Sequence, residues 1–301
     1  MIMRPAYAAL PLLFLFLLLA TGCPSQGATA PVLPPSAQAQ AVTPLLATSV
    51  LRVGTQRVAF LLETPTELVT VPQVEVATIH PSGGPVTGTA TAVFHEWPFG
   101  TRGSYVTELS FAEAGRWLLS IDLGPGYAPV ELPLDVEETS SVRDIGELAP
   151  FSASKTIADS GGDLSTITSH YAADPDLYQL TIAESLITGR PSVIVFASPA
   201  FCTTPTCGPQ VETVIELKAL YRDQASFIHV EVYDNPAEIQ GDLSLARLSP
   251  VLSEWGLDQV QGYVNESWVF VLGRDGRIAA RFEGYAALTE LEAALLAVSL
   301  D

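Results

Sequence analysis

Between residues 45 and 138 the apolar positions form short runs, and glycine or proline separates one run from the next. The segment 103–109 (GSYVTEL) alternates between apolar and polar residues, and 117–121 (WLLSI) follows a turn at Gly115. Alternation with a period of two indicates strands that bury one face. Repeated short strands with turn residues between them predict an all-β sandwich over 45–138.

From residue 174 onward, amphipathic segments alternate with short and almost fully apolar runs. The apolar runs 192–196 (SVIVF) and 268–272 (WVFVL) are typical of buried strands. The predicted order is helix, strand, helix, strand, partial helix, strand, strand, helix, over 174–188, 192–196, 208–222, 227–233, 244–255, 268–272, 277–282 and 288–298. Alternating strands and helices that end in a hairpin and a helix predict an α/β domain over 174–301, with 139–173 as a connector.

The N-terminal segment has the pattern of an export signal. One positive charge precedes an apolar run over residues 8–20, which has the length of a signal-peptide core and is short for a membrane span. The sequence that follows, Ala20-Thr21-Gly22-Cys23, resembles a bacterial lipobox. This resemblance implies that 1–22 are removed and that Cys23 carries a lipid on the extracytoplasmic face of the cell membrane. Residues 23–44, rich in Pro, Ala, Ser and Gln, predict an extended tether.

The charge of the chain restricts its partners. Acidic residues outnumber basic ones by 33 to 14, which gives a formal net charge of −19. A chain of this charge is repelled by nucleic acid and by anionic lipid head groups, so we expect no nucleic-acid partner. Attachment to the membrane therefore has to come from the lipid and not from a basic patch.

Two of the three cysteines lie close together in the segment 196–210 (FASPAFCTTPTCGPQ). A predicted buried strand leads there into a loop, and the loop leads into a predicted helix. A thiolate at a helix N-terminus is stabilised by unpaired backbone N–H groups, which lowers the pKa of the thiol. A second thiol nearby can resolve a mixed disulfide. Cys202 and Cys207 are therefore candidates for redox chemistry, and Pro205 stiffens the loop between them.

The strand, the cysteine loop, the helix and the terminal strand-strand-helix resemble the thioredoxin-like superfamily over about 174–300. The similarity fits best to membrane-anchored thiol-disulfide oxidoreductases and to Sco-type copper chaperones. It implies a thioredoxin-like fold and thiol-disulfide exchange with protein thiols or disulfides as partners, without a bound cofactor. The site that it implies consists of an attacking Cys202 and a resolving Cys207, shaped by Pro205, Gly208, Pro209, Glu266 and Ser267.

The cysteine loop departs from that family in two respects. Four residues separate the cysteines, whereas thioredoxins have two and Sco-type proteins three. The stretch Cys207-Gly208-Pro209 resembles the thioredoxin Cys-Gly-Pro-Cys, but the distance from the strand favours Cys202 as the nucleophile, so both registers stay open. Thioredoxins also place a cis-proline just before the strand equivalent to 268–272. Ser267 stands there, and we expect a trans peptide because a cis bond would cost about 3 kcal/mol.

The β-rich part carries a second resemblance. The pattern G-x-Y at 103–105, followed by F-x-x-A-G-x-W-x-L-x-I at 111–121, resembles the end of small immunoglobulin-like extracytoplasmic modules, including the YtkA/FixH-like group. It implies an immunoglobulin-like sandwich before the thioredoxin-like domain. We expect Tyr105 and Trp117 to be core residues and not ligand contacts.

Other functions stay open. The stretch 263–276 resembles the part of Sco-type proteins that presents a copper-binding histidine, but Glu266 stands at that position and the mature chain would lack methionine, a soft copper ligand. No zinc site is predicted, because two further ligands at local spacing are missing. The cysteines are also consistent with a structural disulfide in a non-enzymatic envelope binding protein, because exported compartments are oxidising. Residues 198–204 weakly resemble a peroxidatic loop, with Pro199 in place of its usual threonine. The direction of exchange is not readable from the sequence.

Overall fold

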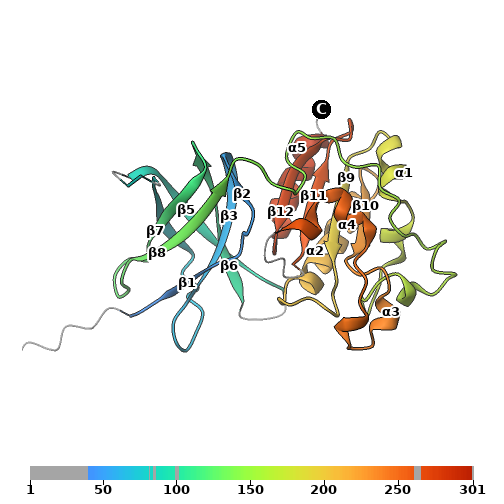
Figure 1. Cartoon of the computed structure of the whole chain (residues 1–301), viewed down its shortest axis with the longest axis horizontal. Helices are drawn as coiled ribbons and strands as arrows, with labels where there is room; N and C mark the ends of the chain where they lie inside the picture. Colours follow the sequence, from blue (N-terminus) through green and yellow to red (C-terminus); the bar gives the residue numbers. More distant parts are fainter. Residues whose placement is uncertain (1–39, 81, 84–85, 99–101, 261–265, 300–301) are drawn as a thin grey trace, which may run out of the picture. The chain divides into compact units, whose positions relative to one another are not determined.

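The computed structural model describes residues 40–80, 82–83, 86–98, 102–260 and 266–299 (Figure 1). These residues belong to one compact unit of the chain that spans 38–301. The predicted signal peptide, Cys23 and nearly all of the predicted tether lie outside the described residues. Within the described part, no helix is both long and apolar enough to cross a membrane. The predicted domain boundaries stay predictions.

The first eight strands form one sheet, drawn in blue to green in Figure 1. In sheet order they are β1 (Thr43–Leu46), β3 (Gly54–Glu63), β6 (Gly103–Phe111), β5 (Val86–Glu96), β4 (Gln73–Ile79), β7 (Gly115–Asp122), β8 (Val130–Glu137) and β2 (Leu51–Arg52). Neighbours pair antiparallel, except that β2 runs parallel to β8. The sequence predicted a sandwich of two layers. In the structure the β4–β5 hairpin pairs on one side with β6 and on the other with β7, so hydrogen bonds join all eight strands into one continuous sheet.

The core of this sheet holds the two aromatic residues that the sequence assigned to it. Tyr105 and Trp117 are both buried. The Tyr105 hydroxyl donates to the carbonyl oxygens of Val69, at 3.2 Å, and Val71, at 3.0 Å, and the Trp117 indole donates to the carbonyl of Glu113 at 3.0 Å. Because these polar atoms have partners, both rings bury their apolar area without leaving a donor unpaired.

The last four strands form a second sheet in the order β10 (Ser226–Glu231), β9 (Ser192–Ala197), β11 (Trp268–Leu272) and β12 (Ile278–Glu283). Strands β9 and β10 are parallel, whereas β11 runs antiparallel to both β9 and β12. From the central strand β9 the chain passes through a helix to the edge strand β10. It then returns to the other side of β9 in the β11–β12 hairpin. This strand order is that of the thioredoxin fold, so the predicted thioredoxin-like fold is confirmed.

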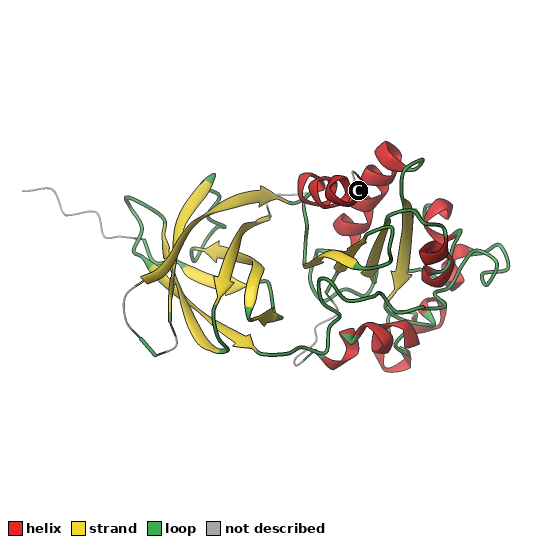
Figure 2. Ribbon diagram, turned by 90° about the horizontal axis from the view of Figure 1, so that it is seen from above, coloured by secondary structure: helices red, strands yellow, loops and turns green. Residues whose placement is uncertain are grey.

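Helices cover both faces of the second sheet (Figure 2). They are α1 (Ile182–Ile187), α2 (Cys207–Tyr221), α3 (Pro236–Ile239), α4 (Pro250–Trp255) and α5 (Leu288–Ser299), with short 3-10 turns at Leu164–Thr166, Pro175–Tyr178, Leu243–Leu245 and Leu257–Gln259. Alternate residues of β9 point to opposite faces: Val193 and Val195 pack with α2 and α5, and Ile194 and Phe196 pack with α1 and α4. Both faces of β9 are therefore buried, which explains its uninterrupted apolar sequence.

Two predicted helices are shorter in the structure, for local reasons. The predicted helix over 174–188 is divided into a 3-10 turn and α1, because Thr181 starts a new helix: its hydroxyl accepts from the Glu184 N–H, and the Glu184 carboxylate accepts from the Thr181 N–H. In the predicted segment 244–255, helix α4 begins only at Pro250, because a proline fits the first turn of a helix and not its interior.

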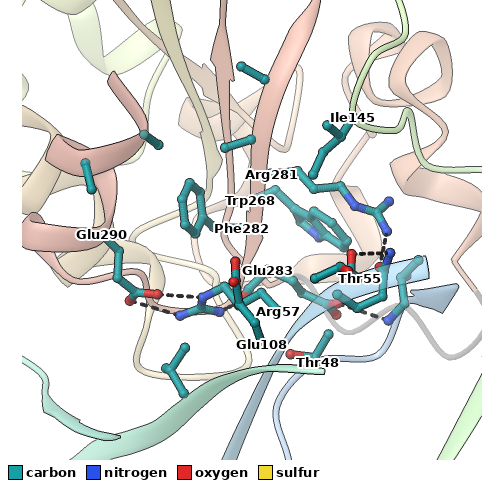
Figure 3. Close-up of a pocket in the computed structure, with 17 residues that line it drawn as sticks. Thr48, Thr55, Arg57, Glu108, Ile145, Trp268, Arg281, Phe282, Glu283 and Glu290 are labelled. Carbon is teal, nitrogen blue, oxygen red and sulfur yellow. Dashed lines mark hydrogen bonds and ion pairs between the residues drawn. The ribbon is translucent and has the colours of Figure 1, made fainter. Parts of the chain in front are cut away.

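Side chains of the first sheet meet β12 and α5 around a cavity of about 380 Å³ (Figure 3). Arg57 of β3 makes a bidentate ion pair with Glu290 of α5, at 2.8 and 3.1 Å. Glu283, the last residue of β12, accepts hydrogen bonds from the backbone N–H groups of Ser49, at 2.8 Å, and Val50, at 3.1 Å, and from the Ser49 hydroxyl. Buried polar contacts thus join segments that are more than 200 residues apart in the sequence.

Candidate functional site

The two cysteines that the sequence singled out are bonded to each other. Cys202 lies in the loop after β9, Cys207 is the first residue of α2, and their Cα atoms are 6.0 Å apart. Cys207 is fully buried, whereas Cys202 is partly exposed. A sulfur atom from another molecule can therefore approach this disulfide only from the side of Cys202.

The start of α2 shows where each of the two registers that the sequence left open places its cysteine. Cys207, Gly208 and Pro209 form the first turn of the helix, as the Cys-Gly-Pro pattern predicts, but the exposed position belongs to Cys202. Gln210, which stands where a thioredoxin has its second cysteine, is buried, and its side-chain oxygen accepts from the Ala286 N–H at 2.6 Å. Pro205 is exposed in the loop between the cysteines.

Two threonine hydroxyls lie between the disulfide and the carboxyl group of Glu266. The Thr204 hydroxyl is 2.8 Å from both carboxylate oxygens, and the Thr206 hydroxyl donates to one of them. The Cys202 sulfur lies 3.7 Å from the Thr204 hydroxyl oxygen and 4.0 Å from that of Thr206. The two hydroxyl oxygens are 2.9 Å apart. A continuous chain of polar contacts therefore leads from the Cys202 sulfur to the Glu266 carboxyl group.

Burial raises the pKa of Glu266, while hydrogen bonds from Thr206, Thr204 and the Ser267 backbone N–H oppose this rise. Ser267 is buried, and its hydroxyl donates to the Gly284 carbonyl at 3.0 Å. Among the described residues no peptide bond is cis, so the bond before Ser267 is trans. The structure thus brings Glu266 and Ser267 against the cysteine loop, on the side where the sequence placed them.

Thr204 and Thr206 were not among the predicted site residues. The available signal was weak: two threonines flank Pro205 between the cysteines, and an acidic residue precedes a buried strand 60 positions later. Their contact with Glu266 depends on how β11 lies beside β9, which pairs Trp268 with Phe196.

Two other titratable groups are buried on β10. The His229 ring contacts the Tyr178 hydroxyl at 2.6 Å and the Ala197 carbonyl at 3.0 Å, and burial lowers its pKa to about 4. Glu231 accepts from the backbone N–H and the hydroxyl of Ser169, both at 2.7 Å, and burial raises the pKa of its carboxyl group. His229 is therefore neutral near neutral pH and serves as a packing residue. The hydrogen bonds of Glu231 to Ser169 hold the connector against β10.

His170 and Asp234 are also engaged in local contacts. The His170 ring nitrogen Nε2 lies 3.1 Å from a carboxylate oxygen of Glu212 on α2. Asp234 pairs with Lys155 at 2.8 Å. Within the described ranges, no cluster of three or more His, Cys, Asp or Glu residues is arranged to hold a metal ion.

No family model matches the chain, and no curated protein matches it. One similar solved structure is a thiol:disulfide interchange protein of the thioredoxin family from Chlorobium tepidum TLS. The match covers 44% of this chain and 96% of that chain, at 11% sequence identity and a TM-score of 0.31. The thioredoxin-like fold therefore rests on the strand order and the placement of the helices described above.

Proposed function

We propose that this protein is an exported, lipid-anchored thiol-disulfide exchange protein that acts through Cys202 and Cys207. The observation that carries the proposal is the bonded cysteine pair at the junction of β9 and α2, with one cysteine exposed and the other at a helix start. A disulfide at that junction of a thioredoxin-like fold fits thiol-disulfide exchange.

The burial of Cys207 determines the order of the chemical steps. A partner thiolate attacks the Cys202 sulfur, a bond forms between these two sulfurs, the Cys202–Cys207 bond breaks, and Cys207 leaves as a thiolate. A second partner thiolate then attacks the partner sulfur of the mixed disulfide and releases Cys202 as a thiolate. Two partner thiols are thereby oxidised to one disulfide while the cysteine pair is reduced. The same steps in reverse reduce a partner disulfide.

The position of Cys207 suits it to be the leaving group. It is the first residue of α2, which has 15 residues, and unpaired N–H groups at a helix start stabilise a thiolate. The Thr206 hydroxyl, which precedes the helix, donates to Glu266 and does not cap α2. Between Phe196 and Glu216 the sequence has no Lys, Arg or His, so the helix start is the local source of this stabilisation.

The proposed location follows from the N-terminal sequence. The lipobox-like stretch before Cys23 supports acylation of this residue, and the acidic chain requires such an anchor. Metabolic labelling with a radioactive fatty acid is expected to mark the wild-type protein but not Cys23→Ser. Label that persists in the variant would mean that the lipid is attached to another residue. An unlabelled wild-type protein would contradict the proposed lipid anchor.

We also propose that the first eight strands are an immunoglobulin-like domain over 45–138, followed by a connector and a thioredoxin-like domain over 174–301. The support is the strand order, in which β1–β3–β6–β5 and β4–β7–β8–β2 form two consecutive groups and the short β2 runs parallel to β8. Limited proteolysis is expected to cut first within 139–173. A first cut within either group of strands would contradict these boundaries.

Exchange is tested by trapping. In the full chain with Cys23→Ser, we expect Cys207→Ser to accumulate mixed disulfides with protein partners through Cys202. Cys202→Ser is the matched control and should trap none, because its remaining thiol is buried. A reduction potential of the pair below about −300 mV together with no trapped partner would indicate a structural bridge. Tight stoichiometric Cu(I) binding by the reduced protein would instead support a Sco-like copper chaperone.

A further inference from the structure

The exchange steps above leave the carboxyl group of Glu266 without a role, although it contacts the cysteine loop. Within the described part of the chain, no Lys, Arg or His forms an ion pair with it. Its hydrogen-bond donors include the two hydroxyl groups nearest to the Cys202 sulfur. The Glu266 carboxyl group thus has no ion-pair partner among the residues that the structure describes and is hydrogen-bonded to hydroxyl groups that contact the Cys202 sulfur. This arrangement suits proton exchange between the carboxyl group and that sulfur.

We propose that Glu266 accepts the proton of the Cys202 thiol, and returns it, through the hydroxyl group of Thr204. In the reduced protein the Cys202 S–H transfers its proton to the Thr204 oxygen as the Thr204 hydroxyl proton passes to the Glu266 carboxylate. The products are a thiolate and a neutral carboxylic acid, so the net charge does not change. This inference rests on the proposed function, because the thiolate is used in exchange with a partner disulfide.

The following steps balance in atoms and electrons. The Cys202 thiolate attacks one sulfur of the partner disulfide, a bond forms between them, and the partner's other sulfur leaves as a thiolate. Cys207 then attacks the Cys202 sulfur, its thiol proton passes to the departing partner thiolate, and the Cys202–Cys207 disulfide is restored. In the opposite direction Cys202 itself is the leaving thiolate, and the Glu266 carboxylic acid returns the proton through Thr204.

Burial is the largest influence on Glu266 and raises the pKa of its carboxyl group, while hydrogen bonds from Thr206, Thr204 and the Ser267 N–H lower it. The charge of Glu266 in turn disfavours ionisation of Glu283 on β12. Glu63, Arg102 and Tyr285 line the same cavity of about 330 Å³ as Glu266 and the cysteine loop. A raised pKa brings the carboxyl group nearer to neutral pH, where a proton acceptor is most effective.

A purely electrostatic role for Glu266 predicts the opposite sign. If its negative charge only repelled the thiolate, Glu266→Gln would lower the pKa of the Cys202 thiol and make this thiol react faster near pH 7. If Glu266 accepts the proton, the same substitution removes the acceptor and the thiol reacts more slowly. The direction of the change in rate therefore separates the two roles.

The test measures alkylation of Cys202 by iodoacetamide from pH 5 to 9, in the full chain with Cys23→Ser and Cys207→Ser as background. We expect Glu266→Gln to slow the reaction at least tenfold at pH 6–7 and to converge with the background above pH 9. Thr204→Val with Thr206→Val should have the same effect, because it keeps the carboxyl group but removes both hydroxyl bridges. Thr203→Val is the matched control, since Thr203 is exposed in the same loop.

A solvent isotope effect gives a second readout that loss of structure would not produce. At pH 6–7 the background protein should react more slowly in D2O than in H2O, because the thiol must first transfer its proton. The Glu266→Gln variant and the double threonine variant should lose this difference. Glu266→Asp should restore part of the rate. A faster Glu266→Gln, an unchanged double threonine variant, or equal effects of Thr203→Val would overturn the proposal. These outcomes do not depend on a protein partner, whereas failure of the proposed function would appear as the absence of trapped partners.

Discussion

Glu283 offers a direct test of the buried contacts between the two sheets. This residue is 7% exposed, its carboxyl group accepts hydrogen bonds from Ser49 and Val50, and it lines the cavity in Figure 3. Burial, which is only partly offset by those hydrogen bonds, raises its pKa from 4.5 to about 7, and the charge of Glu266 adds to the rise. The guanidinium of Arg57 is engaged with Glu290 and does not neutralise Glu283.

The raised pKa fixes the sign and the size of a pH effect on stability. Between pH 4.5 and about 7 the native protein keeps the Glu283 proton while the unfolded chain has released it. The native state therefore binds more protons, and this group's stabilising contribution is complete below pH 4.5 and is lost as the pH rises to about 7. About 2.5 pH units at about 1.4 kcal/mol each give a loss of about 3 kcal/mol.

Glu283→Gln removes this titration while it keeps a hydrogen-bond acceptor. We expect the variant to be as stable as the wild type near pH 5 and more stable at pH 8, with a Tm difference that grows by about 6–12 °C across this range. Thermal unfolding followed by circular dichroism measures it, and the difference between variant and wild type cancels the other titrating groups. Glu290→Gln is the contrasting control, because it leaves the Arg57 guanidinium unpaired and should lower the Tm most at neutral pH. A Tm difference between Glu283→Gln and wild type that does not change with pH would refute the reasoning.

Three other substitutions and one treatment test the fold. Gly256→Ala should cost more than about 3 kcal/mol in urea unfolding, because the added Cβ would lie 1.8 Å from a backbone carbonyl of the connector at a φ of 71°. Gly189→Ala, at a φ of 70° but with no atom within 4 Å, should cost only about 1–2 kcal/mol, and equal losses would contradict the packing described for the connector. Trp255→Ala should cost about 3–5 kcal/mol, because its fully buried ring fills one face of the second sheet; a loss below about 1 kcal/mol would be inconsistent with that burial. Reduction of the Cys202–Cys207 bond, which closes six residues, should lower the free energy of unfolding by about 2 kcal/mol, and an unchanged Tm after reduction would argue against this.

Much of the architecture around the second sheet could be read from the sequence, because its signals are local. The apolar run of β9 and the Gly-Arg-Asp-Gly turn after β11 predicted a buried strand and a hairpin, and both are present. The predicted helix over 174–188 was wrong in one respect, because the capping box at Thr181 divides a segment that the apolar spacing alone made continuous. Residues 244–255 were predicted to be only partly helical, and helix α4 begins there at Pro250.

The candidate site was predicted only in part. The cysteines lie five positions apart, so their proximity follows from the chain itself, and Glu266 was placed opposite them by resemblance to a family. The different exposure of Cys202 and Cys207 could not be predicted, because it depends on where α2 begins and on the core beneath it. The hydroxyl chain from Cys202 to Glu266 was likewise not predicted, since it joins residues about 60 positions apart.

The sequence by itself determined the order of strands and helices, the position of the cysteine pair between a strand and a helix, and the acidic charge of the chain, because periodicity, turn residues and composition act over a few neighbouring positions. The tertiary structure alone decided that eight strands pair as one sheet, that Cys207 is buried while Cys202 is partly exposed, and that Glu283 is removed from water. Burial and polar contacts of this kind depend on which distant segments the fold brings together, and residue type and spacing along the chain do not specify them.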